Sequence, residues 1–237
     1  MSKKVMHKAA TRGHANHGWL NSHHSFSFAS YHNPERMGFG LLRVLNDDEV
    51  AAGMGFGAHP HDNMEIVSIP LEGELAHKDS TGNSKIIQTN EVQIMSAGTG
   101  LTHSEFNHSK TDPVKFLQIW VFPKERNIEP RYEQKAFRPE DRVNQLQTVV
   151  SPDKNGDAIW INQDAWFTLG SLKEGFSEEY KVHKPGNGVY AFVLEGEVEI
   201  DGEKLGRRDG LGISETEAFQ IKASGDAELL LMEVPMQ

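Results

Sequence analysis

Short apolar runs bounded by turn residues set the pattern along this chain. Helical periodicity is weak throughout, and each run has the length of a strand and stops at residues such as glycine, asparagine, aspartate or proline. Strands that recur about every 8–12 residues are typical of an all-β sandwich or barrel, so any helix is expected to be short. The strand-like runs are residues 39–45, 65–71, 84–89, 92–97, 114–122, 158–163, 166–172, 189–202, 211–214, 219–223 and 227–234.

A polar, charged stretch, residues 124–147, separates two groups of these runs and is expected to be an extended connector. On either side of it, residues 69–79 (IPLEGELAHKD) and 192–202 (FVLEGEVEIDG) place the same Leu-Glu-Gly-Glu turn between strand-like runs. This weak repeat indicates a duplication, although such turns are also common between unrelated strands. Pro70 cannot donate to a sheet ladder, so we expect it at an edge or a bulge.

Bulk composition narrows the class of protein and its surroundings. Hydrophobic residues make up 37% and charged residues 24% of the chain, as in a soluble globular protein. The formal net charge of -10 disfavours nucleic-acid binding, because phosphate contacts need clustered Lys and Arg. There are no cysteines, which excludes disulfides, thiolate metal sites and a cysteine nucleophile, and fits a reducing compartment. With no apolar run of about 18 residues and no signal-peptide core, we expect a cytoplasmic protein without membrane contact.

The stretch GFGAHPHDNMEI, residues 55–66, holds the first candidate for chemistry. Alternate residues of a strand point to the same face, so His59 and His61 project together if this segment is extended. Pro60 between them favours that geometry at His59. In a chain with 12 histidines, such a pair is also consistent with an ordinary polar loop.

A second pair with the same spacing lies in GTGLTHSEFNHS, residues 98–109. Here His103 and Glu105 are again two residues apart, and the alternative for them is a surface turn. Two strands that each offer an inward pair would form a cluster of three imidazoles and one carboxylate. That ligand set suits Fe(II), Mn, Co, Ni or Cu and also accommodates Zn. Four protein ligands around an octahedral ion leave two positions for substrate, water or O₂, which favours oxygen chemistry over a structural role.

Glu65 is the rival to Glu105 as the carboxylate ligand. It has the strand parity of His61, but four extended residues span about 13 Å, so reaching the same ion requires a bend. We therefore prefer Glu105 and expect Glu65 to have a supporting or structural role.

The remaining histidines and aromatic residues are expected to serve structure. The spacings of the N-terminal histidines give no strand face shared with the main cluster, so a loop or structural role is expected for them. Trp120 lies in the middle of a predicted strand and is expected in the core, as are Phe56 and Met95, for which the mouth of a pocket is the alternative. The N-terminal histidines are His14, His17, His23 and His24.

The spacing G-x5-H-x-H-x3-E, from Gly53 to Glu65, resembles the first motif of the cupin superfamily, and H-x3-N, from His103 to Asn107, resembles the end of its second motif. The usual proline and first glycine of the second motif are absent; Gly98 and Val92 stand there. Four longer segments together resemble the pirin family, and the C-terminal half is more loosely similar to its quercetinase-like branch. These segments are residues 11–48, 56–66, 91–107 and 117–134.

The resemblance implies an all-β bicupin fold of two antiparallel β-barrels arranged face to face. It implies an N-terminal cupin domain with the start of the connector, residues 1–134, and a C-terminal cupin domain without metal ligands, residues 135–237. One divalent, iron-type metal, with Fe(II) preferred, is then expected in the first barrel only. The second half has neither a His-x-His nor a His-x-Glu pair at the corresponding places, and a lone histidine such as His183 is usually not a ligand. The implied ligands are His59, His61, His103 and Glu105.

The resemblance also implies an activity, flavonol 2,3-dioxygenation of the quercetinase type. The substrate would be a flavonol or another enol or phenol, with O₂ as second substrate and Glu105 as base as well as ligand. The alternative is a regulatory protein that binds other proteins in a metal-dependent way. A third reading is a binding or structural protein with a vestigial site.

Overall fold

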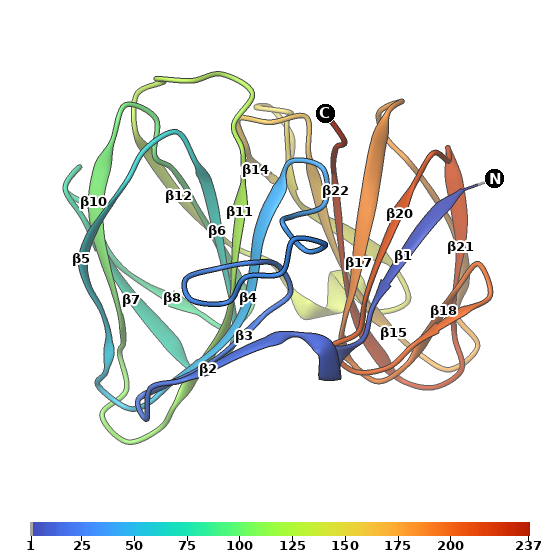
Figure 1. The fold of residues 1–237 in the computed structure, drawn as a ribbon, viewed down its shortest axis with the longest axis horizontal. Helices are drawn as coiled ribbons and strands as arrows, with labels where there is room; N and C mark the ends of the chain where they lie inside the picture. Colours follow the sequence, from blue (N-terminus) through green and yellow to red (C-terminus); the bar gives the residue numbers. More distant parts are fainter. Residues whose placement is uncertain (1) are drawn as a thin grey trace.

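The computed structural model describes residues 2–237, and its regular secondary structure is almost entirely strand. Each half of the chain pairs a seven-stranded sheet with a four-stranded sheet, which gives two β-barrels side by side (Figure 1). The only helical elements in the described residues are two short 3₁₀ turns, η1 (Ala9–Thr11) and η2 (Pro139–Arg142). None of these residues forms a helix that is long and apolar enough to cross a membrane. The all-β, two-barrel prediction is confirmed.

The first barrel contains the strands that carry the predicted site. Its strands pair antiparallel throughout, so residues far apart in sequence lie directly opposite one another. The seven-stranded sheet has the order β12 (Arg131–Ala136), β9 (Glu91–Ser96), β6 (Glu65–Glu72), β11 (Val114–Val121), β4 (Leu42–Val50), β3 (Leu20–His24) and β2 (Gly13–Asn16). The four-stranded sheet has the order β5 (Gly55–His61), β10 (Leu101–Asn107), β7 (Glu74–Asp79) and β8 (Ser84–Gln88).

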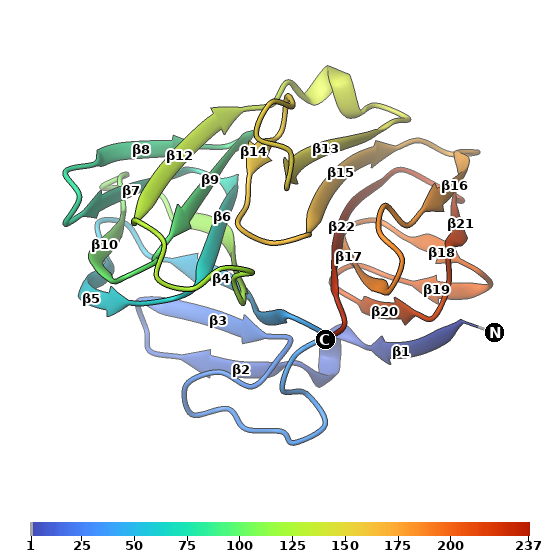
Figure 2. The same cartoon turned by 90° about the horizontal axis from the view of Figure 1, so that it is seen from above.

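The second barrel repeats this arrangement, with one strand taken from the start of the chain. β1 pairs with β20, so the N-terminal strand lies in the second sheet although it precedes the whole first barrel (Figures 1 and 2). The seven-stranded sheet has the order β1 (Lys3–His7), β20 (Gly210–Ser214), β17 (Asn187–Glu195), β22 (Ala227–Pro235), β15 (Trp166–Leu172), β13 (Leu146–Ser151) and β14 (Ile159–Trp160). The four-stranded sheet has the order β16 (Ser177–Lys181), β21 (Ala218–Ala223), β18 (Val198–Ile200) and β19 (Glu203–Leu205). The division of the chain at residue 134 stays a prediction, and residues 3–7 are an addition to the second sheet.

The prediction of an extended connector over residues 124–147 is wrong for part of that stretch. Residues 131–136 form β12, which pairs with β9, and residues 146–147 begin β13. β12 is the end strand of its sheet, and none of its side chains is fully buried. An edge strand tolerates polar residues because solvent reaches it, so its sequence lacks the apolar alternation of a core strand.

Three of the four N-terminal histidines, His14, His23 and His24, lie on strands, whereas His17 lies in the turn between β2 and β3, as a loop role requires. His14 is on β2 directly opposite His23 on β3, and the two rings stack with centroids 4.6 Å apart. Pro70 behaves as expected, since it lies in β6 where the register against β11 shifts, between Lys115 and Phe116.

The Leu-Glu-Gly-Glu repeat marks equivalent turns in the two barrels. Gly73 joins β6 to β7 and Gly196 joins β17 to β18, with φ angles of +81° and +78°. Each lies against the chain just before a long strand: a Cβ on Gly73 would be 3.1 Å from the Pro113 carbonyl oxygen, and one on Gly196 would be 2.1 Å from that of Asp226. Both turns therefore require glycine.

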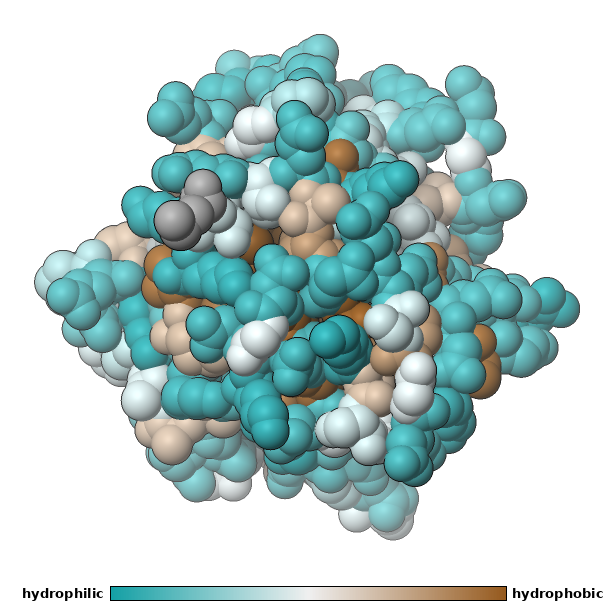
Figure 3. Space-filling view, turned by 90° about the vertical axis from the view of Figure 1, so that its right-hand side faces the viewer, coloured by the Kyte–Doolittle hydropathy of each residue, from teal (hydrophilic) through white to brown (hydrophobic). Residues whose placement is uncertain are grey.

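The two seven-stranded sheets face each other across a shared apolar core. In the first barrel Leu45, Val67 and Ile119 stand in one row of this interface, and Phe167 and Met232 belong to the same core from the other side. Side chains alternate between the two faces of a strand, so the residues next to these three on each strand point into the interior of the first barrel. Figure 3 shows that the outer side of the second barrel is mainly hydrophilic, with small hydrophobic patches between the hydrophilic residues.

The interiors of the two barrels differ in chemistry. The second is filled by one continuous apolar cluster that includes Val189, Leu229 and Ile221. The first contains only two small apolar clusters, separated by buried polar side chains. Polar groups cost free energy when they are buried without partners, so this interior is unsuited to a purely structural role. The buried polar residues include Ser22, His24, Asn46, Asp48, Glu65, Ser68, His77, Asp79, Gln93, Ser96, His103, Glu105, Asn107 and Gln118.

Candidate metal centre

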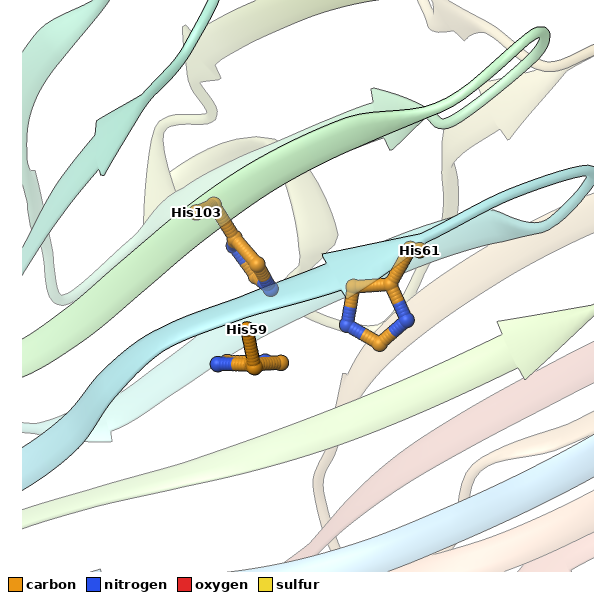
Figure 4. Close-up of side chains that lie close together, drawn as sticks. All are labelled: His59, His61 and His103. Carbon is orange, nitrogen blue, oxygen red and sulfur yellow. The ribbon is translucent and has the colours of Figure 1, made fainter.

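Three of the predicted ligands converge between β5 and β10. His103 on β10 lies directly opposite His59 on β5, and His61 projects from the same face of β5 (Figure 4). The ring centroids are 4.4 Å apart for His59 and His103 and 4.9 Å apart for His61 and His103. One nitrogen of each ring lies within 4.8 Å of the others. The segment is extended, as strand parity requires, so the three rings share one side of the four-stranded sheet.

Hydrogen bonds leave a free nitrogen lone pair on two of these rings. His59 Nδ1 lies 2.8 Å from the Gly57 carbonyl oxygen, which can only accept, so Nδ1 carries the proton and Nε2 is free. His103 Nε2 is buried and has no hydrogen-bond partner in residues 2–237. A buried acceptor without a partner is costly, and a metal ion would satisfy it. The donor set therefore fits a bound divalent metal.

A chain of hydrogen bonds behind His103 sets the same tautomer. The Asp79 carboxylate accepts from His77 Nε2 at 3.0 Å, which leaves His77 Nδ1 as an acceptor. His103 Nδ1 lies 3.5 Å from that atom and donates to it in a long hydrogen bond. Asp79 is itself held by Thr81 and Asn83, and these bonds outweigh its burial and lower its pKa to about 2. His77 was missed by sequence reasoning, because nothing in ELAHKD shows that β7 lies beside β10.

Glu105 lies next to the three histidines in a separate polar group. Its carboxylate accepts hydrogen bonds from Ser68 Oγ at 3.3 Å and from Gln118 Nε2 at 2.7 Å. One of its oxygens lies within 4.8 Å of ring nitrogens of His77 and His103, but Glu105 is not in the cluster formed by His59, His61 and His103. The register of β5 against β10 shifts between His103 and Glu105. The extra residue of this bulge lies on β5. β10 keeps a regular register with β7, so His103 and Glu105 still project from the same face of β10.

Burial keeps His61 and His103 neutral and therefore ready to bind a metal. Desolvation, with the neighbouring rings adding to it, lowers the pKa of His61 to about 4 and that of His103 to about 3. Imidazole must be deprotonated to coordinate, so neither ring needs to lose a proton at neutral pH. Burial raises the pKa of Glu105 to about 7, which shows how unfavourable a carboxylate is here without a nearby cation.

Glu65 lies in the same barrel but in neither group. Its Oε2 atom accepts from Ser96 Oγ at 2.8 Å and from the Asn162 backbone N–H at 3.1 Å. Asn162 belongs to the second half of the chain, so Glu65 links the two halves. Burial raises its pKa to about 7.

A cavity of about 120 Å³ adjoins the centre, and both His59 and Glu105 line it. Phe56 and Trp120 line it too, so both contribute to the pocket rather than only to the core. The Trp120 ring lies edge-on to His61, with centroids 4.9 Å apart. Asp48 also contributes, and sequence reasoning missed it. The alternation of Asn46 and Asp48 in LRVLNDDEV, polar at inward positions of an apolar strand, was the available signal.

The second barrel has different side chains at the equivalent positions. β16 and β21 occupy the places of β5 and β10, and Tyr180 pairs with Phe219 as His59 pairs with His103. These two residues and Ile221 belong to the apolar cluster. His183 packs against Trp166 and bonds to Glu233 at 2.8 Å.

Comparisons with known proteins agree with this geometry. Residues 5–121 match the pirin family model, and residues 148–234 match that of the quercetinase C-terminal cupin domain. The chain is 46% identical to the quercetin 2,3-dioxygenase of Escherichia coli K12 over 97% of its length and 98% of the relative's. It is 40% identical to a pirin-like protein of Caulobacter vibrioides over 93% and 95%.

Solved structures give the same result. The bacterial pirin YhhW of Escherichia coli in complex with nickel(II) superposes with a TM-score of 0.93 at 43% identity, covering 98% of this chain and 99% of that one. Two matching family models, full-length relatives and a shared fold leave one assignment: this chain belongs to the pirin family.

Proposed function

We propose that this protein is a metal-dependent dioxygenase that cleaves flavonols such as quercetin with O₂. The observation that carries the proposal is the cluster of three imidazoles beside a cavity that also contains a carboxylate. Support comes from full-length relatives that carry the name quercetin 2,3-dioxygenase. A cytoplasmic location and a flavonol or related enol as substrate complete the proposal.

His59, His61 and His103 would hold one divalent metal, with Glu105 as the fourth ligand. Fe(II) is our preferred ion, and the nickel(II) complex of YhhW supports the view that a related site also accepts nickel. When bound, such an ion supplies Lewis acidity toward a substrate hydroxyl and a site for O₂ chemistry.

Residues of the chain would supply proton transfer, orientation and exclusion of water. Glu105 would take the proton of the substrate hydroxyl, because its carboxylate lines the cavity and is oriented by Ser68 and Gln118. Trp120 and Phe56 would cover the bound ring and exclude water. His77 would hold the His103 ring with Nε2 directed at the ion.

The direct test is oxygen uptake together with loss of flavonol absorbance, using protein loaded in turn with Fe(II), Mn, Co, Ni and Cu. We expect about one metal equivalent per chain, and coupled consumption of O₂ and quercetin with at least one metal. Full loading without turnover for every metal would reject the enzyme and favour the metal-dependent regulatory alternative. Failure to load any metal would reject both.

Replacing His77 tests its orienting role. Phenylalanine removes both hydrogen bonds of His77, so metal affinity should fall by about 10–100-fold, as is typical when an outer partner of a ligand is lost. Glutamine can still accept from His103 and donate to Asp79, so H77Q should keep most of the affinity. Titration calorimetry with Ni(II) measures both variants. Equal affinities for H77F and H77Q would contradict the role.

A further inference from the structure

The cavity beside the centre has room for about one ring. Its volume is about 120 Å³. A dry cavity of about 150 Å³ binds benzene, whereas pockets that enclose drug-sized ligands measure about 300–1,000 Å³. A three-ring flavonol therefore cannot be enclosed here as a whole.

Three aromatic side chains give this cavity apolar walls. The Phe28 and Trp120 rings pack edge to face with centroids 5.4 Å apart, and Phe56 packs in the same way against Trp19 at 5.4 Å. Phe28, Phe56 and Trp120 all line the cavity. Aromatic pairs with this geometry favour a planar apolar guest over a flexible one.

The wall formed by β3 and β4 of the seven-stranded sheet is polar and faces the four-stranded sheet that carries His59 and Glu105. Ser22, His24, Asn46 and Asp48 line this part of the cavity. They are bonded to one another: Ser22 donates to Asp48 Oδ1, and His24 Nδ1 donates to Asn46 Oδ1 at 2.9 Å. The proposed chemistry uses none of these four.

The direction of these bonds leaves acceptors for a ligand. With Nδ1 protonated, His24 Nε2 is an acceptor, and burial lowers the pKa of His24 and so keeps it neutral. Asp48 is 5% exposed, and within residues 2–237 only its Oδ1 atom has a hydrogen-bond partner. A guest that donates a hydrogen bond at this wall satisfies the remaining acceptors. An anionic guest would meet Asp48 and Glu105 together, which disfavours it.

We propose that the site is built for a neutral single-ring phenol or enol with a second hydroxyl, which donates to the Asp48 wall while the first hydroxyl faces the metal centre. Only the placement of the first hydroxyl at the metal centre rests on the proposed function. A flavonol then places one ring in this cavity and leaves the remainder outside. Asp48 is then a specificity-determining residue, because ring compounds with a second hydroxyl bind more tightly than ring compounds without one.

The test uses Ni(II)-loaded protein without O₂, so that binding is measured in the absence of turnover. Titration calorimetry at pH 8 compares resorcinol with 3-fluorophenol, which has nearly the same size but no second O–H. Resorcinol should bind at least about tenfold more tightly, because a hydrogen bond to a charged group is worth that much or more. In D48A the ratio should fall close to one. The control is E49Q, an exposed glutamate next to Asp48 on the same strand, which should keep the ratio.

Three results would overturn the proposal: equal affinities in the unmodified protein, a ratio that survives in D48A, or no binding of resorcinol. The comparison of the two phenols needs no variant, so it decides the question even where D48A fails to fold. Loss of the proposed function would appear separately, as absence of flavonol turnover in a protein that still discriminates the two phenols.

Discussion

Replacing His59 by alanine is expected to abolish metal binding and flavonol turnover together while leaving the fold intact. His59 is only partly buried, so its removal opens no cavity in the core. Loss of an outer partner of a ligand typically costs about 10–100-fold in metal affinity, and loss of a ligand itself should cost more. Metal quantitation after dialysis and oxygen uptake with quercetin measure the two effects.

The matched control is H108A. His108 has an exposed side chain just beyond the end of β10, and it contacts Glu74 only at 3.9 Å. It should keep one metal equivalent and full turnover. Turnover in H59A, or equal losses in H59A and H108A, would locate the chemistry elsewhere in the molecule.

That His103 lies opposite His59 depends on the pairing of β5 with β10, which is not a local feature of the sequence. Strand parity predicted that the side chains of each pair share one inward face, and this needs only two local facts. Each pair alternates on an extended segment, and a barrel directs one face of each strand inward. The position of Glu105 was less predictable. Parity correctly places it on the face of His103, and one of its oxygens lies within 4.8 Å of a His103 ring nitrogen. It is not grouped with His59 and His61, which lie beyond the extra residue of β5.

The supporting residues depend on pairings between distant strands, which a single sequence does not reveal. His77 meets His103 because β7 and β10 are neighbours, although 26 positions separate the two residues. Asp48 and Ser22 likewise meet across β3 and β4. β1, β2 and β12 were missed because their sequences are polar, and their edge positions in the sheets explain that polarity. β3 lies inside its sheet, and its polar residues Ser22 and His24 are buried in the first barrel.

The contrast between the barrel interiors explains why one half carries the candidate site. Tyr180 and Phe219 complete an apolar core in the second barrel, at the positions where the first has His59 and His103. The second barrel therefore stabilises itself and offers a seven-stranded face against which the first can pack. Through this shared core the first barrel compensates for its polar interior, which on its own would weaken its stability.

Replacing Glu105 by glutamine is expected to lower turnover by about 10²–10⁴-fold while the protein still binds metal, because the amide cannot take a proton and the three imidazoles remain. Glutamine has the shape of glutamate and can keep the hydrogen bond from Gln118, so the cavity should retain its form. Steady-state oxygen uptake, normalised to bound metal, measures the effect.

The same substitution at Glu65 provides the control. Glu65 is a buried carboxylate of the same barrel whose pKa burial also raises to about 7, yet it bonds to Ser96 and Asn162 and lies in neither ligand group. E65Q should therefore keep turnover within a few-fold of the unmodified protein, even where its thermal stability changes. If E105Q kept its turnover and E65Q lost it, the base would be Glu65 and the preference for Glu105 would be wrong. If both kept it, proton abstraction would belong to neither carboxylate, and Asp48 would be the remaining buried acid of the cavity.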